Sequence, residues 1–148
     1  GKPGIIIRGI AVKPGKPTNI AIVDEKPIFS LPGHPTSSLL MFHILVRPMI
    51  SKMAGKADET SQLIEAITEE KMFSEKGRRT FIMVSLSHNK TGRVLASPVP
   101  SGLSGAITTL TKADGFIEIP ENQQFINAGE DVKVYLLKPI SDLSFLEK

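Results

Sequence analysis

The stretch Ala11–Ser38 reads AVKPGKPTNIAIVDEKPIFSLPGHPTSS and contains two proline-glycine turns, KPGKP and LPGHP. Each turn follows an apolar run typical of a strand, Gly9–Val12 for the first turn and Pro27–Leu31 for the second. Ile20–Val23 forms another such run between them, and Asp24-Glu25-Lys26 is typical of a hairpin turn. Strands and turns followed by a helix predict an α/β unit for the first part of the chain.

A helical pattern begins directly after the second turn. Apolar residues recur there at steps of three and four, namely Leu39, Phe42, Val46, Met49, Ile50 and Met53. This spacing predicts one amphipathic helix over Thr36–Ala54 with the apolar stripe in the core. We expect Thr36 or Ser37 to cap its start, Gly55 to end it, and Pro48 to disturb it by removing one backbone bond.

Beyond the helix, the polar stretch Ala54–Ser61 predicts a linker between two domains, 1–56 and 57–148. The second domain has the texture of a β structure, with one short helix expected over Leu103–Ala113. Short strands separated by polar turns predict a small barrel or sandwich. The strand candidates are Leu63–Thr68, Thr80–Ser87, Val94–Ser97, Gly115–Ile119 and Asp131–Leu137. The fold class predicted from these patterns is an α/β unit followed by a small, mainly β, barrel-like domain.

Composition excludes several kinds of function. The chain of 148 residues has no cysteine, which excludes disulfides, thiol nucleophiles and cysteine-based zinc sites. Its net charge of +3 is too small for the basic stripe of a nucleic-acid-binding protein. No apolar run approaches the ~18 residues that a membrane span needs. With no signal peptide recognised at the start, cytoplasmic localisation is the default expectation.

The chemistry of the first domain depends on its two turns. Lys13 and Lys16 place two ammonium groups on a loop that prolines stiffen, and Gly15 allows close approach of its backbone to a ligand. LPGHP precedes a helix start, where free N–H groups favour an anion, and Ser37 and Ser38 add hydroxyl donors. The two turns therefore predict one anion pocket. The alternative is that they are only structural turns with solvated lysines.

These motifs resemble a known family. KPGKPT, then FSLPGHPTSS, and a helix ending VRPMISKMAG are similar to the molybdopterin molybdenumtransferases, the MoeA and gephyrin E-domain group. KGRRTF (Lys76–Phe81), Pro100–Glu121 and NAGEDVKVYLL (Asn127–Leu137) resemble the small C-terminal β domain of that family. The resemblance runs from about Arg8 to Leu137, nearly the whole chain.

The resemblance implies insertion of molybdate into adenylylated molybdopterin, with molybdopterin as the substrate and Mg²⁺ held by acidic residues outside this chain. Full-length relatives also have an N-terminal region and further parts of the molybdopterin-binding domain, so the resemblance implies that the α/β domain here is partial. The sequence is therefore expected to be a fragment, a short protein or one piece of a split protein. A homodimer is expected, with a second chain as a further source of the N-terminal region. Neither nucleic acid nor membrane is an expected partner.

The family motifs also imply roles for individual residues. Lys13 matches the lysine that opens KPGKP and is expected to be catalytic, as an anion ligand. Binding of substrate and anion is implied for Gly15, Lys16, Pro32, Gly33, His34, Pro35, Ser37, Ser38, Arg78, Arg79 and Ser104. Ser104 is expected to face the site across the dimer.

The chain departs from the family pattern at several of these positions. His34 replaces the usual asparagine of the LPGNP turn, and its ring titrates where an amide does not. Many relatives have a basic residue at the position of Gly9, and in this chain Arg8 lies one place away from it. Some relatives have an arginine at the position of Met83. Fewer cations predict weaker oxyanion binding, unless Arg78 and Arg79 compensate.

Two main classes of function follow. In the first, the chain is a portion of a molybdenum-insertion enzyme. In the second, it is a non-catalytic pterin-binding, oligomerisation or scaffold module. A β domain without any ligand is a further alternative. Assay of the chain alone for molybdenum insertion separates the first two.

Overall fold

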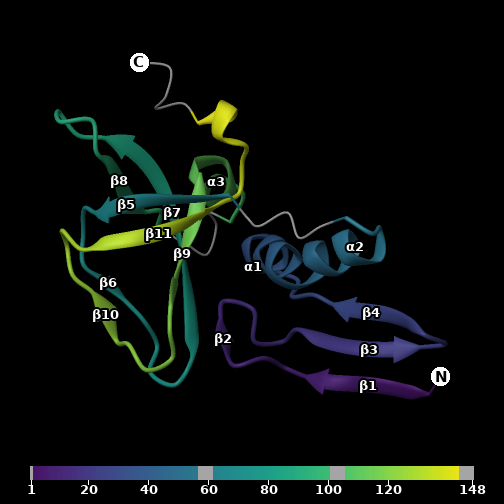
Figure 1. Ribbon diagram of the computed structural model, residues 1–148. Helices are drawn as coiled ribbons and strands as arrows, with labels where there is room; N and C mark the ends of the chain where they lie inside the picture. Colours follow the sequence, from purple (N-terminus) through teal and green to yellow (C-terminus); the bar gives the residue numbers. More distant parts are fainter. Residues whose placement is uncertain (1, 57–61, 101–105, 144–148) are drawn as a thin grey trace. The chain divides into compact units, whose positions relative to one another are not determined.

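A computed structural model describes residues 2–56, 62–100 and 106–143. The chain divides into two compact units, Gly1–Glu59 and Thr60–Lys148, which are considered separately below (Figure 1). Most of the predicted linker lies outside the described residues, and so does Ser104, one of the expected site residues.

The first unit contains a three-stranded antiparallel sheet in the order β1-β3-β4. Its strands are β1 (Pro3–Arg8), β3 (Asn19–Val23) and β4 (Lys26–Ser30), and a two-residue strand β2 (Val12–Lys13) lies in the loop after β1. Asp24 and Glu25 make the tight turn between β3 and β4, both with positive φ, at 49° and 63°. Such φ values are those of a type I′ hairpin turn, which matches the twist of the two strands.

One continuous helical segment follows β4, as the apolar periodicity predicts. It consists of α1 (Pro35–Met41), the π-helical segment η1 (Phe42–Val46) and α2 (Arg47–Met53). Within η1 the Arg47 N–H donates to the carbonyl of Phe42, five residues back. The wider turn lies where Pro48 lacks an N–H and its ring would crowd the carbonyl four residues before it. The predicted disturbance near Pro48 is confirmed.

The two ends of the helical segment differ in how well the sequence predicted them. The helix begins at Pro35, with His34 at the N-cap position and no side-chain capping bond, so the prediction of Thr36 or Ser37 as the cap is wrong. Proline is favoured in the first helical turn because its missing N–H has no partner there in any case. The predicted stop at Gly55 is confirmed, since Gly55 takes a left-handed φ of +67°.

The main correction in the first unit is that much of the predicted apolar stripe is exposed. Leu40 and Met41 are buried, but Phe42 and Met49 are exposed and Met53 is 67% exposed. The expectation that the last three residues lie in the core is therefore wrong for this chain. Periodicity marks a helix face that favours an apolar neighbour, yet it does not supply that neighbour.

The second unit is a closed barrel, so the barrel alternative holds over the sandwich. Its strands run in the order β7-β8-β5-β11-β9, and β9 also pairs with β7, which closes the sheet. Among the described residues of these strands, β5 and β8 pair in parallel, and the other neighbouring strands pair antiparallel. The strands are β5 (Leu63–Thr68), β7 (Arg79–His88), β8 (Val94–Pro98), β9 (Gly115–Ile119) and β11 (Asp131–Leu136). All these strands agree closely with the predicted ranges.

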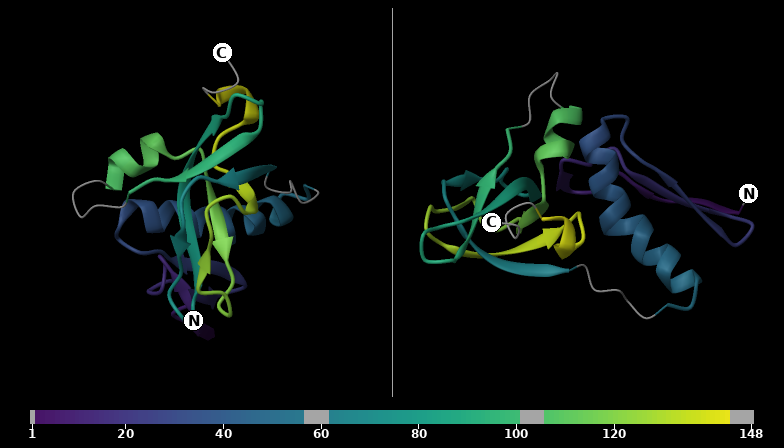
Figure 2. Two further views of the ribbon diagram at one scale, coloured as in Figure 1. Left: turned by 90° about the vertical axis from the view of Figure 1, so that its left-hand side faces the viewer. Right: turned by 90° about the horizontal axis from the view of Figure 1, so that it is seen from above.

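Smaller elements complete this unit. A two-stranded ribbon of β6 (Met72–Phe73) and β10 (Phe125–Ile126) was not predicted, because two residues are too few to show alternation. Helix α3 (Ala106–Lys112) lies within the predicted Leu103–Ala113, and a 3₁₀ turn η2 (Ile140–Asp142) follows β11. Figure 2 shows the barrel strands from two further sides.

The barrel core is built from side chains of several strands, although burial along β7 and β9 does not alternate strictly. Inward-facing residues form one buried cluster that includes Val84, Ile117, Val134 and Leu136. The cluster supports a fold class of a partial α/β piece followed by a small β barrel, as predicted.

Candidate functional site

The two turns that the sequence singled out leave the same end of the sheet. In the strand register, Arg8 at the end of β1 lies opposite Asn19, and Asn19 lies opposite Ser30 at the end of β4. The KPGKP loop joins Arg8 to Asn19, and the LPGHP turn follows Ser30 directly. Both turns therefore start from one row of the sheet, which is the geometric condition for a shared site (Figure 1).

The KPGKP loop is held by its own hydrogen bonds. The buried Thr18 hydroxyl donates to the carbonyl of Gly15 at 2.7 Å, and the Thr18 N–H donates to the same oxygen at 3.0 Å. The Ile10 N–H donates to the Lys16 carbonyl at 3.0 Å, and the Gly9 N–H to Asn19 Oδ1 at 3.2 Å. These bonds fix the backbone on both sides of the lysines, so little ordering is needed when a ligand binds.

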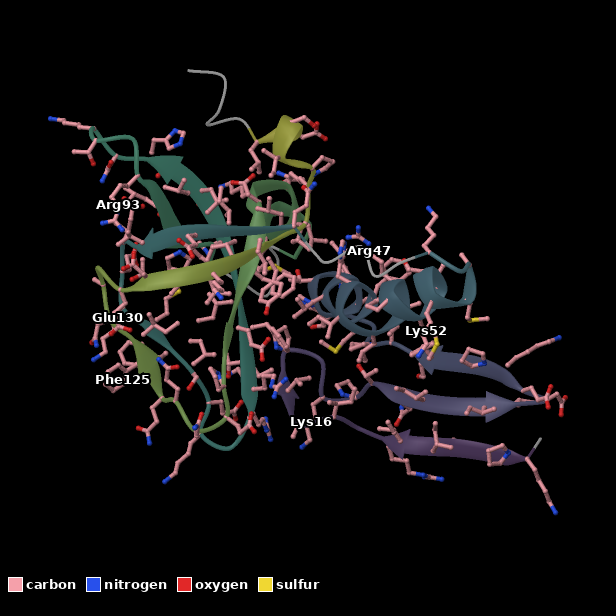
Figure 3. The ribbon with its side chains drawn as sticks, viewed as in Figure 1. Lys16, Arg47, Lys52, Arg93, Phe125 and Glu130 are labelled. Atoms are coloured by element: carbon pink, nitrogen blue, oxygen red, sulfur yellow. The ribbon has the colours of Figure 1, made fainter. Side chains whose placement is uncertain are left out.

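Gly15 brings this loop against the helix that the second turn opens. Its φ is +124°, and a Cβ at this position would lie 2.6 Å from the sulfur of Met41 in α1. Glycine is favoured here by its φ, and any larger residue would also require the flexible Met41 side chain to move. The backbone of the first turn thus packs on the helix that begins at the second turn, while Lys16 remains on the exposed side of the loop (Figure 3).

The second turn offers fewer groups than the sequence analysis expected. Pro32 and Ser37 are buried, whereas Gly33, His34 and Pro35 are exposed. The Ser38 N–H already donates to the His34 carbonyl at 2.9 Å, and Pro35 has no N–H to offer. Of the amides expected to bind an anion, those of Gly33 and His34 are the ones on the exposed part of the turn.

Comparison with known proteins assigns both units to successive parts of one family. Residues 2–52 match the family model described as "Probable molybdopterin binding domain", and residues 65–137 match "MoeA C-terminal region (domain IV)". The chain belongs to the MoeA family. Both halves of the resemblance, the paired turns and the β domain, are therefore confirmed.

Relatives of known name and structure support the assignment to the MoeA family. The chain is 30% identical to molybdopterin molybdenumtransferase 2 of Mycobacterium tuberculosis, over 91% of the chain and 33% of that protein. It is 28% identical to the molybdopterin molybdenumtransferase of Bacillus subtilis, over 90% of the chain and 31% of that protein. A crystal structure of the molybdopterin biosynthesis MoeA protein of Pyrococcus horikoshii superposes with a TM-score of 0.79 at 41% identity, over 92% of the chain and 33% of that protein. The chain thus spans about a third of the length of these MoeA relatives.

The arginines that the MoeA resemblance implicates are held by carboxylates. Arg78 Nη1 lies 3.1 Å from Glu75 Oε2. Arg79 Nε lies 3.2 Å from Glu118 Oε1 and 3.6 Å from Glu121 Oε2. These neighbours compensate both positive charges within the second unit, which weakens their attraction for an oxyanion. Because Glu118 and Glu121 are distant from Arg79 along the chain, no local pattern could predict this pairing.

His43 lies in η1 and is half-buried. Its ring meets Phe42 edge to face at 6.1 Å. Partial burial, followed by the nearby Arg47 charge, lowers the pKa of His43 from its usual 6.5. The imidazole is therefore held neutral near pH 7.

Neither a metal cluster nor a membrane-spanning helix occurs in the part of the chain described here. Among these residues, no three His, Asp or Glu side chains gather as metal ligands. No helix within the same ranges is both long and apolar enough to cross a bilayer. The described residues therefore offer no carboxylate cluster that would fit Mg²⁺.

A hollow on the barrel wall was not foreseen from the sequence. It has a volume of about 430 Å³ and is lined by Glu65, Arg93, Asp131, Val132 and Lys133. Arg93, labelled in Figure 3, pairs through Nη2 with Asp131 Oδ1 at 2.8 Å. Lys133 lies opposite Glu65 in the strand register. Opposite charges compensate each other in this hollow, so it gives an anion no net attraction.

Proposed function

We propose that this chain acts in molybdenum cofactor biosynthesis as a portion of a molybdopterin molybdenumtransferase. Its substrates are adenylylated molybdopterin and molybdate. The observation that supports this proposal best is the shared origin of the two turns, since Arg8, Asn19 and Ser30 form one row of the sheet. Membership of the MoeA family and the names of the relatives support the same assignment.

Lys13 and Lys16 supply positive charge to the site in this proposal. Their ammonium groups attract the tetrahedral oxyanion or the pterin phosphate, and Gly15 keeps the backbone between them against α1. A loop whose conformation is fixed beforehand stabilises charge without rearrangement during the reaction. Lys13 acts on the reacting anion, and Lys16 on the bound substrate.

The LPGHP turn forms the other wall of the proposed site. Pro32, Gly33 and Pro35 fix the path of the chain into α1, and His34 takes the place of an amide side chain as a hydrogen-bonding group toward the pterin. Ser37 and Ser38 contribute as hydroxyl donors. For Arg78, Arg79 and Ser104 of the second unit, substrate binding stays a prediction from the MoeA resemblance. Because the described residues offer no Mg²⁺ cluster, no step of the reaction is assigned to a metal on this chain.

Calorimetric titration tests the anion site directly. The 148-residue chain is titrated with molybdate and with a pterin phosphate, as wild type, Lys13→Ala and Lys26→Ala. Charge-assisted contacts are worth about 1.5–3 kcal/mol, so Lys13→Ala is expected to weaken binding about ten- to a hundredfold. Lys26 is an exposed lysine of the same sheet at its opposite end, beside the Asp24–Glu25 turn, and its replacement leaves affinity unchanged. Equal affinities for wild type and Lys13→Ala reject the site.

The same chain is expected to bind its substrate without completing molybdenum insertion. It spans about a third of the relatives' length, and the acidic part of the family's site is not among its described residues. In this respect the chain by itself resembles the alternative, a non-catalytic pterin-binding or scaffold module. Conversion of adenylylated molybdopterin at the rate of a full-length MoeA protein would contradict this expectation. Homodimer formation and a cytoplasmic location remain parts of the proposal.

A further inference from the structure

Thr18 is a buried polar residue to which the proposed function assigns no role. Its exposed fraction is 0%, and its hydroxyl donates to the Gly15 carbonyl at 2.7 Å. Valine has nearly the same shape as threonine, and a buried hydroxyl is costly unless it is hydrogen-bonded. A threonine at this position therefore indicates that the bond to the KPGKP loop matters, and not only the packing of the side chain.

Asn19 makes a second set of side-chain bonds at the other end of the same loop. Its Nδ2 donates to the Pro17 carbonyl at 3.1 Å, and its Oδ1 accepts the Gly9 N–H at 3.2 Å. In the strand register Asn19 lies opposite Arg8, so it is the residue at which the loop returns to the sheet. One amide side chain thus joins the residue that leaves the sheet to the last proline of KPGKP.

Lys16 lies between the two carbonyls that these side chains hold. Its own carbonyl accepts the Ile10 N–H at 3.0 Å, so the three successive carbonyls of residues 15–17 are all hydrogen-bonded. The peptide planes on both sides of the Lys16 Cα are therefore fixed, and Pro17 further restricts the backbone of the residue before it. The direction in which the Lys16 side chain leaves the loop follows from this backbone.

The same bonds affect the electrostatics of the loop. A carbonyl oxygen carries partial negative charge and accepts hydrogen bonds, so a free carbonyl beside Lys16 would repel an oxyanion. Donors from Thr18, Asn19 and Ile10 occupy the three oxygens nearest to Lys16 along the chain. The exposed lysine therefore keeps its full attraction for a phosphate.

We propose that Thr18 and Asn19 are positioning residues of the anion site. The hydroxyl of Thr18 and the amide of Asn19 hold the KPGKP backbone so that the Lys16 ammonium is presented to the phosphate of the bound substrate. Neither side chain contacts the phosphate itself. A loop that is ordered before binding loses less entropy when the ligand binds, so removal of either side chain lowers affinity. This inference rests on the function proposed above, because it requires Lys16 in the site.

Thr18→Val tests the first positioning residue, because it removes the hydroxyl at nearly constant volume. In a calorimetric titration of the 148-residue chain with a pterin phosphate, it is expected to weaken binding about tenfold, which corresponds to one hydrogen bond. Thr18→Ser keeps the hydroxyl and is expected to restore most of the affinity.

Thr68→Val is the matched control for Thr18→Val. Thr68 is 2% exposed, and its hydroxyl donates to the Asn127 carbonyl at 2.7 Å within the barrel unit. The control removes a bond of the same kind and length from an equally buried threonine. It is expected to lower the thermal stability of the chain and to leave the affinity for the pterin phosphate unchanged.

Asn19→Ala tests the second positioning residue in the same titration, and about tenfold weaker binding is expected again. Asn89→Ala is its control, since Asn89 Oδ1 accepts the Arg93 N–H at 2.9 Å and so holds a turn of the barrel unit. This control is expected to bind as wild type does. Circular dichroism and thermal unfolding show which variants keep the fold, and Asn19→Ala decides the test if Thr18→Val does not fold.

A double-mutant cycle with Lys16→Ala separates positioning from a general loss of structure. If Thr18 and Asn19 act through Lys16, then Thr18→Val or Asn19→Ala changes the affinity of the Lys16→Ala chain by less than about twofold. A tenfold loss that persists in the Lys16→Ala chain overturns the positioning role, because the side chains then act elsewhere.

The remaining outcomes distinguish this inference from the proposed function. Wild-type affinity in both Thr18→Val and Asn19→Ala overturns the positioning role and leaves the anion site in place. An equal loss of affinity in Thr68→Val also overturns it, since affinity then follows stability alone. Absence of pterin phosphate binding by the wild-type chain rejects the anion site itself, and the positioning role is rejected with it.

Discussion

The barrel and the first unit, called here the sheet–helix unit, differ in how their strand edges are paired and how their apolar faces are covered. In the barrel, β7 pairs with both β8 and β9, so the sheet closes and its inward side chains fill a common core. In the sheet–helix unit, three antiparallel strands carry apolar residues on both faces, and Ile5 and Ile28 stay exposed. A closed sheet provides its own second layer, whereas an open sheet depends on another part of the protein for it.

This difference explains why equally clear sequence patterns led to different burial. The sequence predicted strands over Gly115–Ile119 and Asp131–Leu137, and in the structure Ile117 and Val134 of these strands are buried. The helical spacing of Met49 and Met53 is just as regular, yet both side chains are exposed. Stability is therefore expected to respond strongly to changes inside the barrel and weakly to changes at exposed residues such as Met49 and Met53.

The largest effect is expected at Gly115 in the barrel. A Cβ there would lie 2.5 Å from the carbonyl oxygen of Tyr135 on β11, and backbone atoms cannot yield as a flexible side chain can. Gly115→Ala is expected to lower the free energy of unfolding of the barrel by about 3 kcal/mol. Tyr135 is the single tyrosine of the chain, which has no tryptophan, so its fluorescence in a urea titration reports on this unit.

The matched control for that change lies in the sheet–helix unit. A Cβ at Gly33 would meet no atom within 4 Å, so Gly33→Ala is expected to leave the stability of the chain nearly unchanged. If Gly115→Ala unfolds at the same urea concentration as wild type, β9 and β11 do not approach as closely as the register requires.

Asp114 gives the next effect, through hydrogen bonds that join separate barrel elements. Its buried carboxylate accepts from the Leu86 N–H on β7 at 2.9 Å and from the Lys138 ammonium after β11 at 3.2 Å. Asp114→Ala leaves a buried N–H without an acceptor and is expected to lower the free energy of unfolding by about 2 kcal/mol.

Asp114→Asn keeps an oxygen that can accept the Leu86 N–H, so its loss of stability should be smaller. Urea titrations of the two variants, again read from Tyr135, separate the contribution of the acceptor from that of the charge. Equal losses for Asn and Ala would show that the Leu86 bond contributes little.

The smallest effect is expected at the β3–β4 turn of the sheet–helix unit. Asp24 and Glu25 both adopt positive φ, which glycine and asparagine tolerate better than glutamate. The double change Asp24→Asn and Glu25→Gly is expected to stabilise this unit by about 1 kcal/mol. Hydrogen exchange of the β3 and β4 amides measures the gain. Glu25→Ala is the control and should give no gain, because alanine is as strained at positive φ; a gain with alanine would mean that the side chain of Glu25, not the backbone, sets the cost.

Local features of the fold and of the candidate site were determined by the sequence itself. Short β-rich runs between polar turns located the barrel strands to within a residue or two, and Pro48 marked the irregular turn of the helix, because these depend on neighbouring residues alone. The spacing of KPGKP and LPGHP likewise indicated two turns near one another, and the row Arg8, Asn19 and Ser30 bears out that they start from the same end of the sheet.

Only the tertiary structure decided which elements pair with each other and which of their faces are buried by a neighbouring layer. Closure of the barrel by β7 and β9, the ion pairs of Arg79 with Glu118 and Glu121, and the packing of Gly15 on Met41 all join residues distant in sequence. Exposure of Met53 belongs to the same class, because an apolar stripe becomes a core only where a neighbouring layer is present. The physical reason is that hydrophobic burial has no direction of its own, so periodicity fixes the face of an element and the rest of the fold fixes its partner.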